Sequence, residues 1–179
     1  MIDCKVNFMK NFSFYVRNFL LIGIALFLFT QAAPAQASTK AHQFQFNGGL
    51  GVFVGTEGLD ASFDISLEPE YFVTEHNSIS LRMDFTIGGF DAFHIAGRWR
   101  YYFDLPNDKI NIFVGLGMGG GAGFHGGGFG DAAVPVFGWQ YDLTPHLKIG
   151  SDVSFDIIFT SNNAAFAARL MPVVLKYAF

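Results

Sequence analysis

The chain has 179 residues, of which 23 are Phe, 21 are Gly and only 15% are charged, and its formal net charge is −4. This sparse and mainly acidic charge excludes a surface that binds nucleic acid through clustered Lys and Arg contacts to phosphate. So much Phe with so little charge is also unusual for a domain that keeps its apolar residues away from water.

Residues 1–37 have the pattern of a secretory signal peptide. Lys10 and Arg17 precede the apolar run 19–30, and small residues in an A-x-A pattern lead up to Ala37. The apolar run is too short for the ~20 residues that a membrane-spanning helix needs. We therefore predict export, with cleavage after Ala37.

The remaining segment, 38–179, has the length of one domain. Of the 11 Lys and Arg and 15 Asp and Glu residues, cleavage leaves 8 basic and 14 acidic. The only cysteine, Cys4, lies in the predicted signal peptide. We therefore expect a mature domain without disulfides or thiol chemistry.

Hydrophobic and polar residues alternate with a period of two through almost the whole of this domain, and no stretch keeps a helical period. Each alternating segment is at least as long as the ~9–11 residues that a tilted strand needs to cross a bilayer. The eight predicted strands are 42–54, 59–74, 78–89, 93–105, 110–124, 133–143, 147–160 and 166–179.

An even number of antiparallel strands can close, so that no strand edge is left unpaired in lipid. The connections alternate between two kinds. Short polar turns are expected at 75–77, 106–109 and 144–146. The other connections are expected at 55–58, 89–92, 125–132 and 161–165. The pattern predicts an all-β, eight-stranded, up-and-down transmembrane barrel with the short turns and both chain ends on the periplasmic side.

Aromatic residues gather where the predicted strands approach the short turns. Tyr71, Tyr101, Trp139 and Tyr141 are the clearest members of this girdle. Aromatic girdles mark the membrane interfaces of transmembrane barrels. A soluble β-sandwich is the alternative, and it would place these side chains inside and scatter them along the strands.

The last strand alternates Met171, Val173, Leu175, Tyr177 and Phe179 on one face. With this ending, the chain resembles the small eight-stranded outer-membrane barrels of the OmpA/OmpX type and the wider outer-membrane β-barrel group. The resemblance implies a location in the outer membrane of a Gram-negative bacterium. It also implies that Leu175, Tyr177 and Phe179 form the signal read by the barrel-assembly machinery. Periplasmic chaperones, outer-membrane lipids and lipopolysaccharide are the other partners it implies.

Charged residues on the polar faces of the strands are expected to fill the lumen. A turn centred near residue 76 would place Glu70 opposite Arg82, and a loop centred near 91 would place Asp84 opposite Arg98. A buried charge without a partner costs several kcal/mol, so we predict one connected charge network. Its members are Glu68, Glu70, Arg82, Asp84, Arg98, Arg100, Asp152 and Asp156.

Candidates for chemistry are few. His94, His125 and Ser161 lie in the predicted outer half, but no local motif couples a nucleophile to a base. The glycine-rich run 115–130 lacks the GK[ST] ending of a phosphate-binding loop. Inward-facing glycines there are expected to make room for bulky Arg and Phe side chains. We expect no catalytic residue, no metal and no cofactor.

The function predicted from these features is that of a non-enzymatic, porin-like integral barrel that supports outer-membrane structure, with its lumen plugged by the charge network. A narrow, low-conductance ion or proton pore is the first alternative. A surface adhesin is the second, although the predicted outer loops are short. A lipid A-modifying enzyme is the third.

Overall fold

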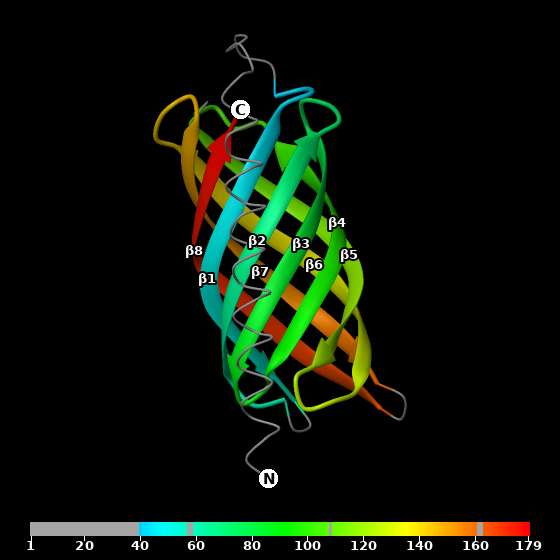
Figure 1. Ribbon diagram of the computed structural model, residues 1–179. Coiled ribbons are helices and arrows are strands. Elements are labelled where there is room, and N and C mark those ends of the chain that lie inside the picture. Colours follow the sequence, from blue (N-terminus) through cyan, green and yellow to red (C-terminus); the bar gives the residue numbers. More distant parts are fainter. Residues whose placement is uncertain (1–39, 57–58, 108, 161–162) are drawn as a thin grey trace. The chain divides into compact units, whose positions relative to one another are not determined.

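A computed structural model describes residues 40–56, 59–107, 109–160 and 163–179. Within these residues the chain forms eight strands, each antiparallel to its neighbours in sequence, and β1 also pairs with β8 to close a barrel (Figure 1). The strands are β1 (Phe44–Gly55), β2 (Ser62–Phe72), β3 (Asn77–Gly88), β4 (Ala92–Phe103), β5 (Ile110–Gly123), β6 (Gly128–Asp142), β7 (Leu147–Phe159) and β8 (Ala164–Ala178). The predicted all-β, eight-stranded, up-and-down antiparallel barrel is confirmed. The predicted signal peptide lies outside the described residues.

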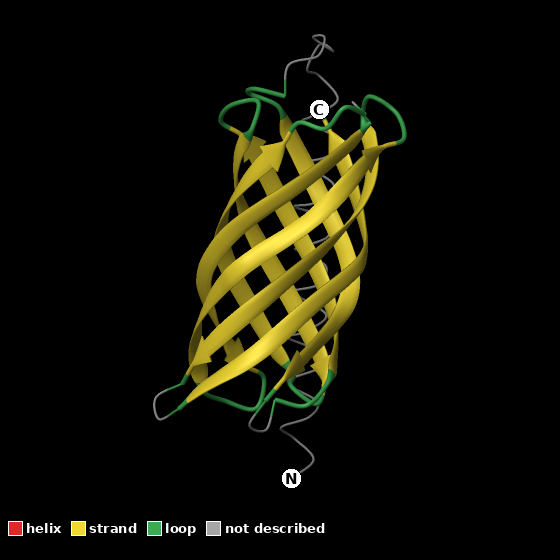
Figure 2. Ribbon diagram, turned by 180° about the vertical axis from the view of Figure 1, so that it is seen from behind, coloured by secondary structure: helices red, strands yellow, loops and turns green. Residues whose placement is uncertain are grey.

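The strands are steeply tilted around the barrel (Figure 2), and their connections gather at two ends. We call one the turn end, where the connections are 73–76, 104–109 and 143–146. We call the other the loop end, where the connections are 56–61, 89–91, 124–127 and 160–163. No helix in the described residues is long and apolar enough to cross a membrane.

Two of the turns are built in the same way around a threonine. The Thr74 hydroxyl oxygen accepts the backbone N–H of Asn77 at 3.0 Å, and that of Thr144 accepts the backbone N–H of Leu147 at 2.9 Å. A Thr side chain that captures nearby backbone N–H groups stabilises a tight reversal of the chain. These turns set the register of the hairpins on either side of them.

Strand β6 begins at Gly128 and not at 133 as predicted. Its first residues continue the ladder with β5, because Gly130 pairs with Gly120 and Gly128 pairs with Ala122. The glycine-rich composition of residues 128–132 led to the prediction of a loop. In the structure these residues form a strand, because they hydrogen-bond to the glycine-rich strand β5. As a result Asp131 lies on a strand and inside the barrel.

Two prolines mark the places where alternation breaks. The register shifts at Val134-Pro135 in β6 and at Pro172 in β8, and each shift affects the pairing on both sides of its strand. Proline has no N–H to donate, which suits these two prolines to bulges, whereas Pro69 of β2 pairs with Phe46 without a shift in register. The prediction that Met171 faces outward is therefore wrong: Met171 is fully buried inside the barrel.

The outer face of the barrel is apolar. Residues such as Phe63, Leu81 and Leu175 have about half of their surface exposed (47%, 48% and 53%) although they lie within regular strands. Exposed apolar area of this extent on every strand indicates a surface that faces lipid.

Candidate functional site

The inside of the barrel is filled by buried polar and charged side chains. We call one connected group of four arginines and six carboxylates the central network. Its members are Asp64, Glu68, Glu70, Arg82, Asp84, Arg98, Arg100, Asp152, Asp156 and Arg169. Each of them is at most 5% exposed.

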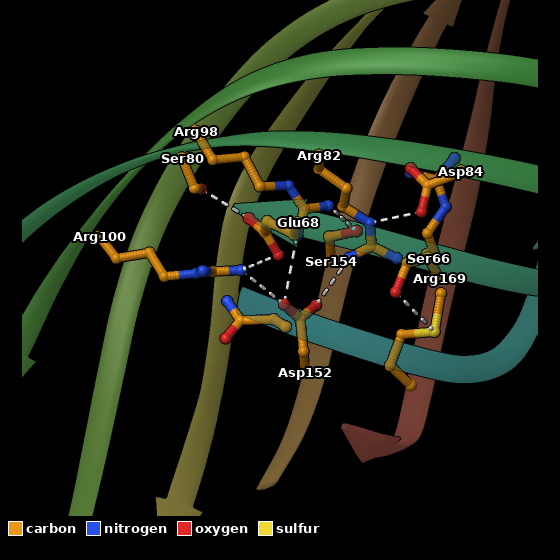
Figure 3. A network of polar contacts seen from close by, with 12 residues as sticks. Ser66, Glu68, Ser80, Arg82, Asp84, Arg98, Arg100, Asp152, Ser154 and Arg169 are labelled. Atoms are coloured by element: carbon orange, nitrogen blue, oxygen red, sulfur yellow. Dashed lines mark hydrogen bonds and ion pairs between the residues drawn. The ribbon is translucent and has the colours of Figure 1, made fainter. Parts of the chain in front are cut away.

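Arg100 joins three carboxylates from two sides of the lumen. Its Nη2 atom lies 2.7 Å from Glu68 Oε2 and 3.0 Å from Asp152 Oδ2 (Figure 3), and its Nη1 atom lies 3.1 Å from Glu70 Oε2. The planar guanidinium carries five N–H donors, which suits it to several carboxylates at once. Arg100 thus ties β4 to β2 and β7 across the interior.

Glu70 is the most fully bonded carboxylate of the network. Tyr102 and Ser78 donate hydrogen bonds to its Oε1 atom at 2.8 and 2.5 Å, and Gln45 and Asn47 donate to Oε2 at 2.7 and 2.8 Å. A buried carboxylate with this many donors remains stable as an anion. Strands β1 to β4 all contribute to this one site.

Asp152 of β7 collects three guanidiniums. Besides Arg100, it contacts Arg82 Nη1 at 3.3 Å and Arg98 Nη1 at 3.2 Å (Figure 3). The expected room for bulky side chains beside inward glycines is observed here. A Cβ atom built on Gly117 would lie 2.9 Å from Cγ of Arg98, so glycine leaves space for the arginine to cross the lumen.

Arg169 of β8 organises the part of the network nearer the loop end. It contacts Asp64 Oδ2 at 2.9 Å, Asp84 Oδ2 at 3.1 Å and Asp156 Oδ2 at 3.4 Å. Arg82 Nε lies 2.5 Å from the other oxygen of Asp84. Removing one partner of such a buried group leaves uncompensated charge, which is strongly destabilising.

His94 connects the central network to the loop end. Its Nδ1 atom lies 3.0 Å from Asp84 Oδ2 and its Nε2 atom lies 3.0 Å from Asp131 Oδ1. Its ring stacks on Phe129, with the ring centroids 5.9 Å apart. The imidazole is thus buried between two carboxylates beneath an aromatic side chain.

Aromatic and aliphatic side chains cover the network at both ends. Toward the loop end, Phe53, Ile158 and Ala167 form a buried cluster, against which Leu59, Phe90 and Phe129 pack. Toward the turn end, the buried cluster consists of Phe72, Tyr102, Phe113, Ala133 and Val136. Guanidiniums lie against both layers, with Arg169 5.3 Å from the ring centroid of Phe53 and Arg100 4.9 Å from that of Phe113.

The structure places all eight predicted lumen residues inside the barrel, but the predicted register is wrong. Glu70 pairs with Ser80 and not with Arg82, and Asp84 pairs with His94 and not with Arg98. The β2–β3 connection is centred near residue 75 and not 76, and the β3–β4 connection is centred near residue 89 and not 91. The contacts between opposite charges form across the lumen rather than only along neighbouring strands.

The residues of the predicted girdle and of the predicted assembly signal lie on the outer side of the barrel. Tyr71 and Trp139 face outward near the turn end, with Tyr101 and Tyr141 half-buried on the same side. Leu175 and Tyr177 lie on the outer side of β8, which ends at Ala178. No observation here tests their part in assembly.

The candidates for chemistry do not come together. His94 is buried in the lumen, whereas the His125 side chain is 88% exposed in a loop, 3.4 Å from Asp91. Ser161 lies outside the described residues. Within the described ranges, no three His, Cys, Asp or Glu side chains are arranged to hold a metal ion.

The predicted charge network did not include Arg169 or Asp64, no prediction placed Asp131 inside the barrel, and no inward role was predicted for Phe53, Phe72, Tyr102 or Phe113. Period two alone would have found Asp64 and Phe72, which share the even positions of β2 with Glu68 and Glu70. Arg169 precedes the bulge at Pro172. Alternation counted backwards from Phe179 without that bulge places Arg169 on the outer face, whereas it is buried inside. No comparable signal in the sequence marks Asp131.

Two hollows lie at the rims of the barrel. One of about 90 Å³ at the loop end is lined by Leu59, Ile158, Thr160, Asn163 and Ala165. One of about 220 Å³ at the turn end is lined by Lys40, Asp104, Leu105, Asn107, Ile110 and Asn111. Neither is lined by a member of the central network.

Comparisons with known proteins identify the fold. No protein-family profile and no curated sequence matches the chain. Among solved structures, Neisserial surface protein A aligns with a TM-score of 0.60 and 13% identity over 76% of this chain and 96% of its own. The N-terminal β-barrel domain of OprF from Pseudomonas aeruginosa aligns with a TM-score of 0.57 and 10% identity over 78% of this chain and 98% of its own. At these identities the likeness shows a shared architecture.

Proposed function

From a fold shared with small eight-stranded outer-membrane barrels, we propose that this protein is a non-enzymatic, integral barrel of the bacterial outer membrane. Its role is structural: it contributes a rigid, sealed element to the membrane and does not pass solutes. The observation that carries this proposal is the lumen, in which a buried network of ion pairs is covered by an apolar layer toward each end.

The packing of the lumen supports a sealed barrel. An eight-stranded barrel has an interior that side chains can fill completely. Here Arg82 and Arg100 each contact carboxylates on other strands, so a passing ion would have to displace pairs that already satisfy one another. It would also have to cross the aromatic layers that contain Phe53 and Phe113.

Single-channel recording of the refolded barrel in planar bilayers tests the sealed lumen. We expect no conductance from the wild type. The matched control is a variant in which Phe53, Phe72, Phe113 and Phe129 are all replaced by alanine, which opens both layers and should give discrete current steps. Heat-modifiable gel mobility establishes that each sample is folded. Discrete steps from the folded wild type would contradict the proposal.

The supporting role is tested in cells. We expect deletion of the gene to increase uptake of a hydrophobic dye, and expression of the wild-type chain to restore the barrier. Unchanged uptake in the deletion strain would exclude a contribution to membrane integrity, even for a barrel that conducts nothing.

We also propose that the turn end faces the periplasm. Two of the three connections at this end are tight turns built around Thr74 and Thr144, and tight turns are usual on the periplasmic side of such barrels. A Gly126→Cys variant should react with a membrane-impermeant maleimide in intact cells, whereas His76→Cys should react only after lysis. Cys4 lies in the predicted signal peptide and should not interfere. The reverse labelling pattern would invert the orientation.

One observation favours a second candidate, a narrow proton path. The buried His94 contacts both Asp84 and Asp131, which makes a continuous series of titratable groups from the loop end into the central network. Vesicles that contain the barrel and a pH-sensitive dye would then show proton flux without any potassium or chloride current. The flux should disappear in His94→Leu, and equal proton leakage from wild type and variant would exclude this path.

A further inference from the structure

A second group of polar residues, some buried and some partly buried, lies at the turn end beyond the aromatic layer, and the function proposed above makes no use of it. We call it the turn-end vestibule. Its members are Lys40, Asn111, Gln140, Asp142, Lys148 and Lys176. Lys40 and Asn111 also line the hollow of about 220 Å³. The vestibule therefore combines buried positive charge with empty space.

Two lysines face each other in this group. Lys148 of β7 and Lys176 of β8 are cross-strand partners, and each is 3% exposed. Like charges directly opposite on neighbouring strands destabilise a sheet. The Lys148 ammonium has Asp142 Oδ1 at 3.6 Å, and Lys176 Nζ donates to the amide oxygen Oε1 of Gln140 at 3.1 Å. The nearby protein groups thus compensate this pair of ammonium groups only in part.

Two amides in the vestibule have buried N–H groups without an acceptor. Asn111 uses its oxygen to accept a hydrogen bond from Lys40, and Gln140 uses its oxygen for Lys176. Nδ2 of Asn111 and Nε2 of Gln140 then have no hydrogen-bond partner among the described residues. The two residues are cross-strand partners on β5 and β6. Buried donors are normally paired, so these two indicate an acceptor that is not part of the protein.

The pKa of Lys40 is affected by the charges around it. Its partial burial, followed by the Lys148 ammonium, lowers the pKa of Lys40 below the usual value, while the carboxylates of Asp142, Asp104 and Glu75 oppose this effect only in part. A lowered lysine pKa indicates an environment that disfavours further positive charge. An anion in the hollow would remove this penalty.

We propose that the turn-end vestibule binds a phosphate group through its anionic oxygens, supplied either by free inorganic phosphate or by a lipid headgroup. Lysine ammonium and amide N–H groups are the donors that phosphate oxygens require. The hollow is also large enough, since a single water needs only about 10–15 Å³. Asp104, which is 76% exposed, lines the hollow, Asp142 lies 3.6 Å from the Lys148 ammonium, and Glu70 of the central network interacts electrostatically with Lys176. This site is independent of whether the lumen is sealed.

The direct test is a calorimetric titration of the refolded wild-type barrel, in phosphate-free detergent, with inorganic phosphate. We expect saturable binding that is weakened about tenfold or more in Lys148→Met, because a charge-assisted hydrogen bond is lost. The matched control is Lys109→Met, which removes an exposed lysine from the same end of the barrel and should bind like wild type. Asn111→Leu removes an unpaired donor without changing charge and should also weaken binding, which covers the case that Lys148→Met does not fold.

Two further measurements identify the source of the phosphate and the role of the site. If a lipid headgroup is the natural occupant, short-chain phosphatidylglycerol should compete with phosphate and bind more tightly; if free phosphate is, the lipid should not compete. NMR of the Lys40 side chain should show its pKa rising as phosphate saturates the site, which a merely structural lysine would not do. The proposal is overturned if neither phosphate nor phosphatidylglycerol binds saturably, or if Lys148→Met and Lys109→Met bind equally.

Discussion

The central network and the turn-end vestibule are both buried and charged, but they differ in how their charges are balanced. The central network contains four guanidiniums and six carboxylates, and each guanidinium reaches at least one carboxylate. The vestibule has three ammonium groups and one carboxylate. Unpaired donors occur in both regions: Nδ2 of Asn111 and Nε2 of Gln140 in the vestibule, and Nε of Arg98 and Arg100 in the central network, whose Nη atoms do reach carboxylates. Negative charge is thus in excess in the middle of the lumen and positive charge at the turn end.

The difference follows from the chemistry of the two cations. Arginine presents a rigid fork that can bridge several carboxylates, as Arg100 and Arg169 do. Lysine is a compact point charge with three donors on a flexible stem, and it lacks the planar fork that holds a carboxylate through two parallel hydrogen bonds. Arginine therefore stabilises the interior by cross-linking strands, whereas the buried lysines cost stability unless something else binds to them. This contrast predicts opposite results when a cation is removed from each region.

The largest effect is expected from Arg169→Met. Three carboxylates, from Asp64, Asp84 and Asp156, lose the cation that they share, in a network that already has an excess of acid. Breaking a buried ion pair from one side costs about 3–5 kcal/mol. Equilibrium unfolding in urea, in lipid vesicles, should show this loss.

Lys109→Met is the control for that experiment, because its side chain is exposed and the substitution should change stability by no more than about 0.5 kcal/mol. If Arg169→Met were no more destabilising than this control, the central network would not be a stabilising plug. The proposed difference, in which arginine stabilises the central network and buried lysine destabilises the vestibule, would then be wrong.

A smaller effect is expected at the boundary between the two regions. Tyr102 donates a hydrogen bond to Glu70 Oε1 at 2.8 Å, while its ring lies 6.0 Å from Lys176 Nζ. Tyr102→Phe removes only the hydroxyl, and a hydrogen bond to a charged group contributes about 1.5–3 kcal/mol. The same unfolding measurement should place the variant between Arg169→Met and Lys109→Met. A neutral result would mean that the other donors to Glu70 compensate fully.

The outer face of the barrel was predictable because lipid exposure imposes one simple rule on every second residue. Strand number, closure and the positions of the short turns follow from that rule together with residues such as Thr74 and Pro145, which favour turns. Alternation predicts which residues face the lumen, but it does not predict which of them lie opposite each other. A small error in the centre of a turn changes which side chains lie opposite each other without moving any residue to the other face, so the paired partners of Glu70 and Asp84 were predicted wrongly.

The remaining misses have separate physical causes. Alternation across Pro172 changes phase, so Met171 was assigned to lipid and Arg169 was overlooked. Asp131 lies in a glycine-rich stretch whose order depends on pairing with β5, which no local pattern reveals. Phe113 looks like a lipid-facing residue by composition, but Gly138 on the next strand leaves room for it inside, since a Cβ there would lie 2.6 Å from the phenylalanine ring.

The smallest effect, and the one of opposite sign, is expected from Lys148→Met. In phosphate-free buffer this substitution removes one of two like charges that face each other, and such cross-strand pairs contribute about 0.2–1 kcal/mol. The variant should therefore be as stable as the wild type or slightly more stable. At the same concentration, phosphate should then raise the stability of the wild type more than that of the variant, because a ligand stabilises the folded state according to how tightly it binds. Urea titrations of both proteins with and without phosphate measure all four values. A variant that loses stability in phosphate-free buffer, as Arg169→Met is expected to do, would mean that Lys148 is satisfied by the protein alone, and the difference between the vestibule and the central network would disappear.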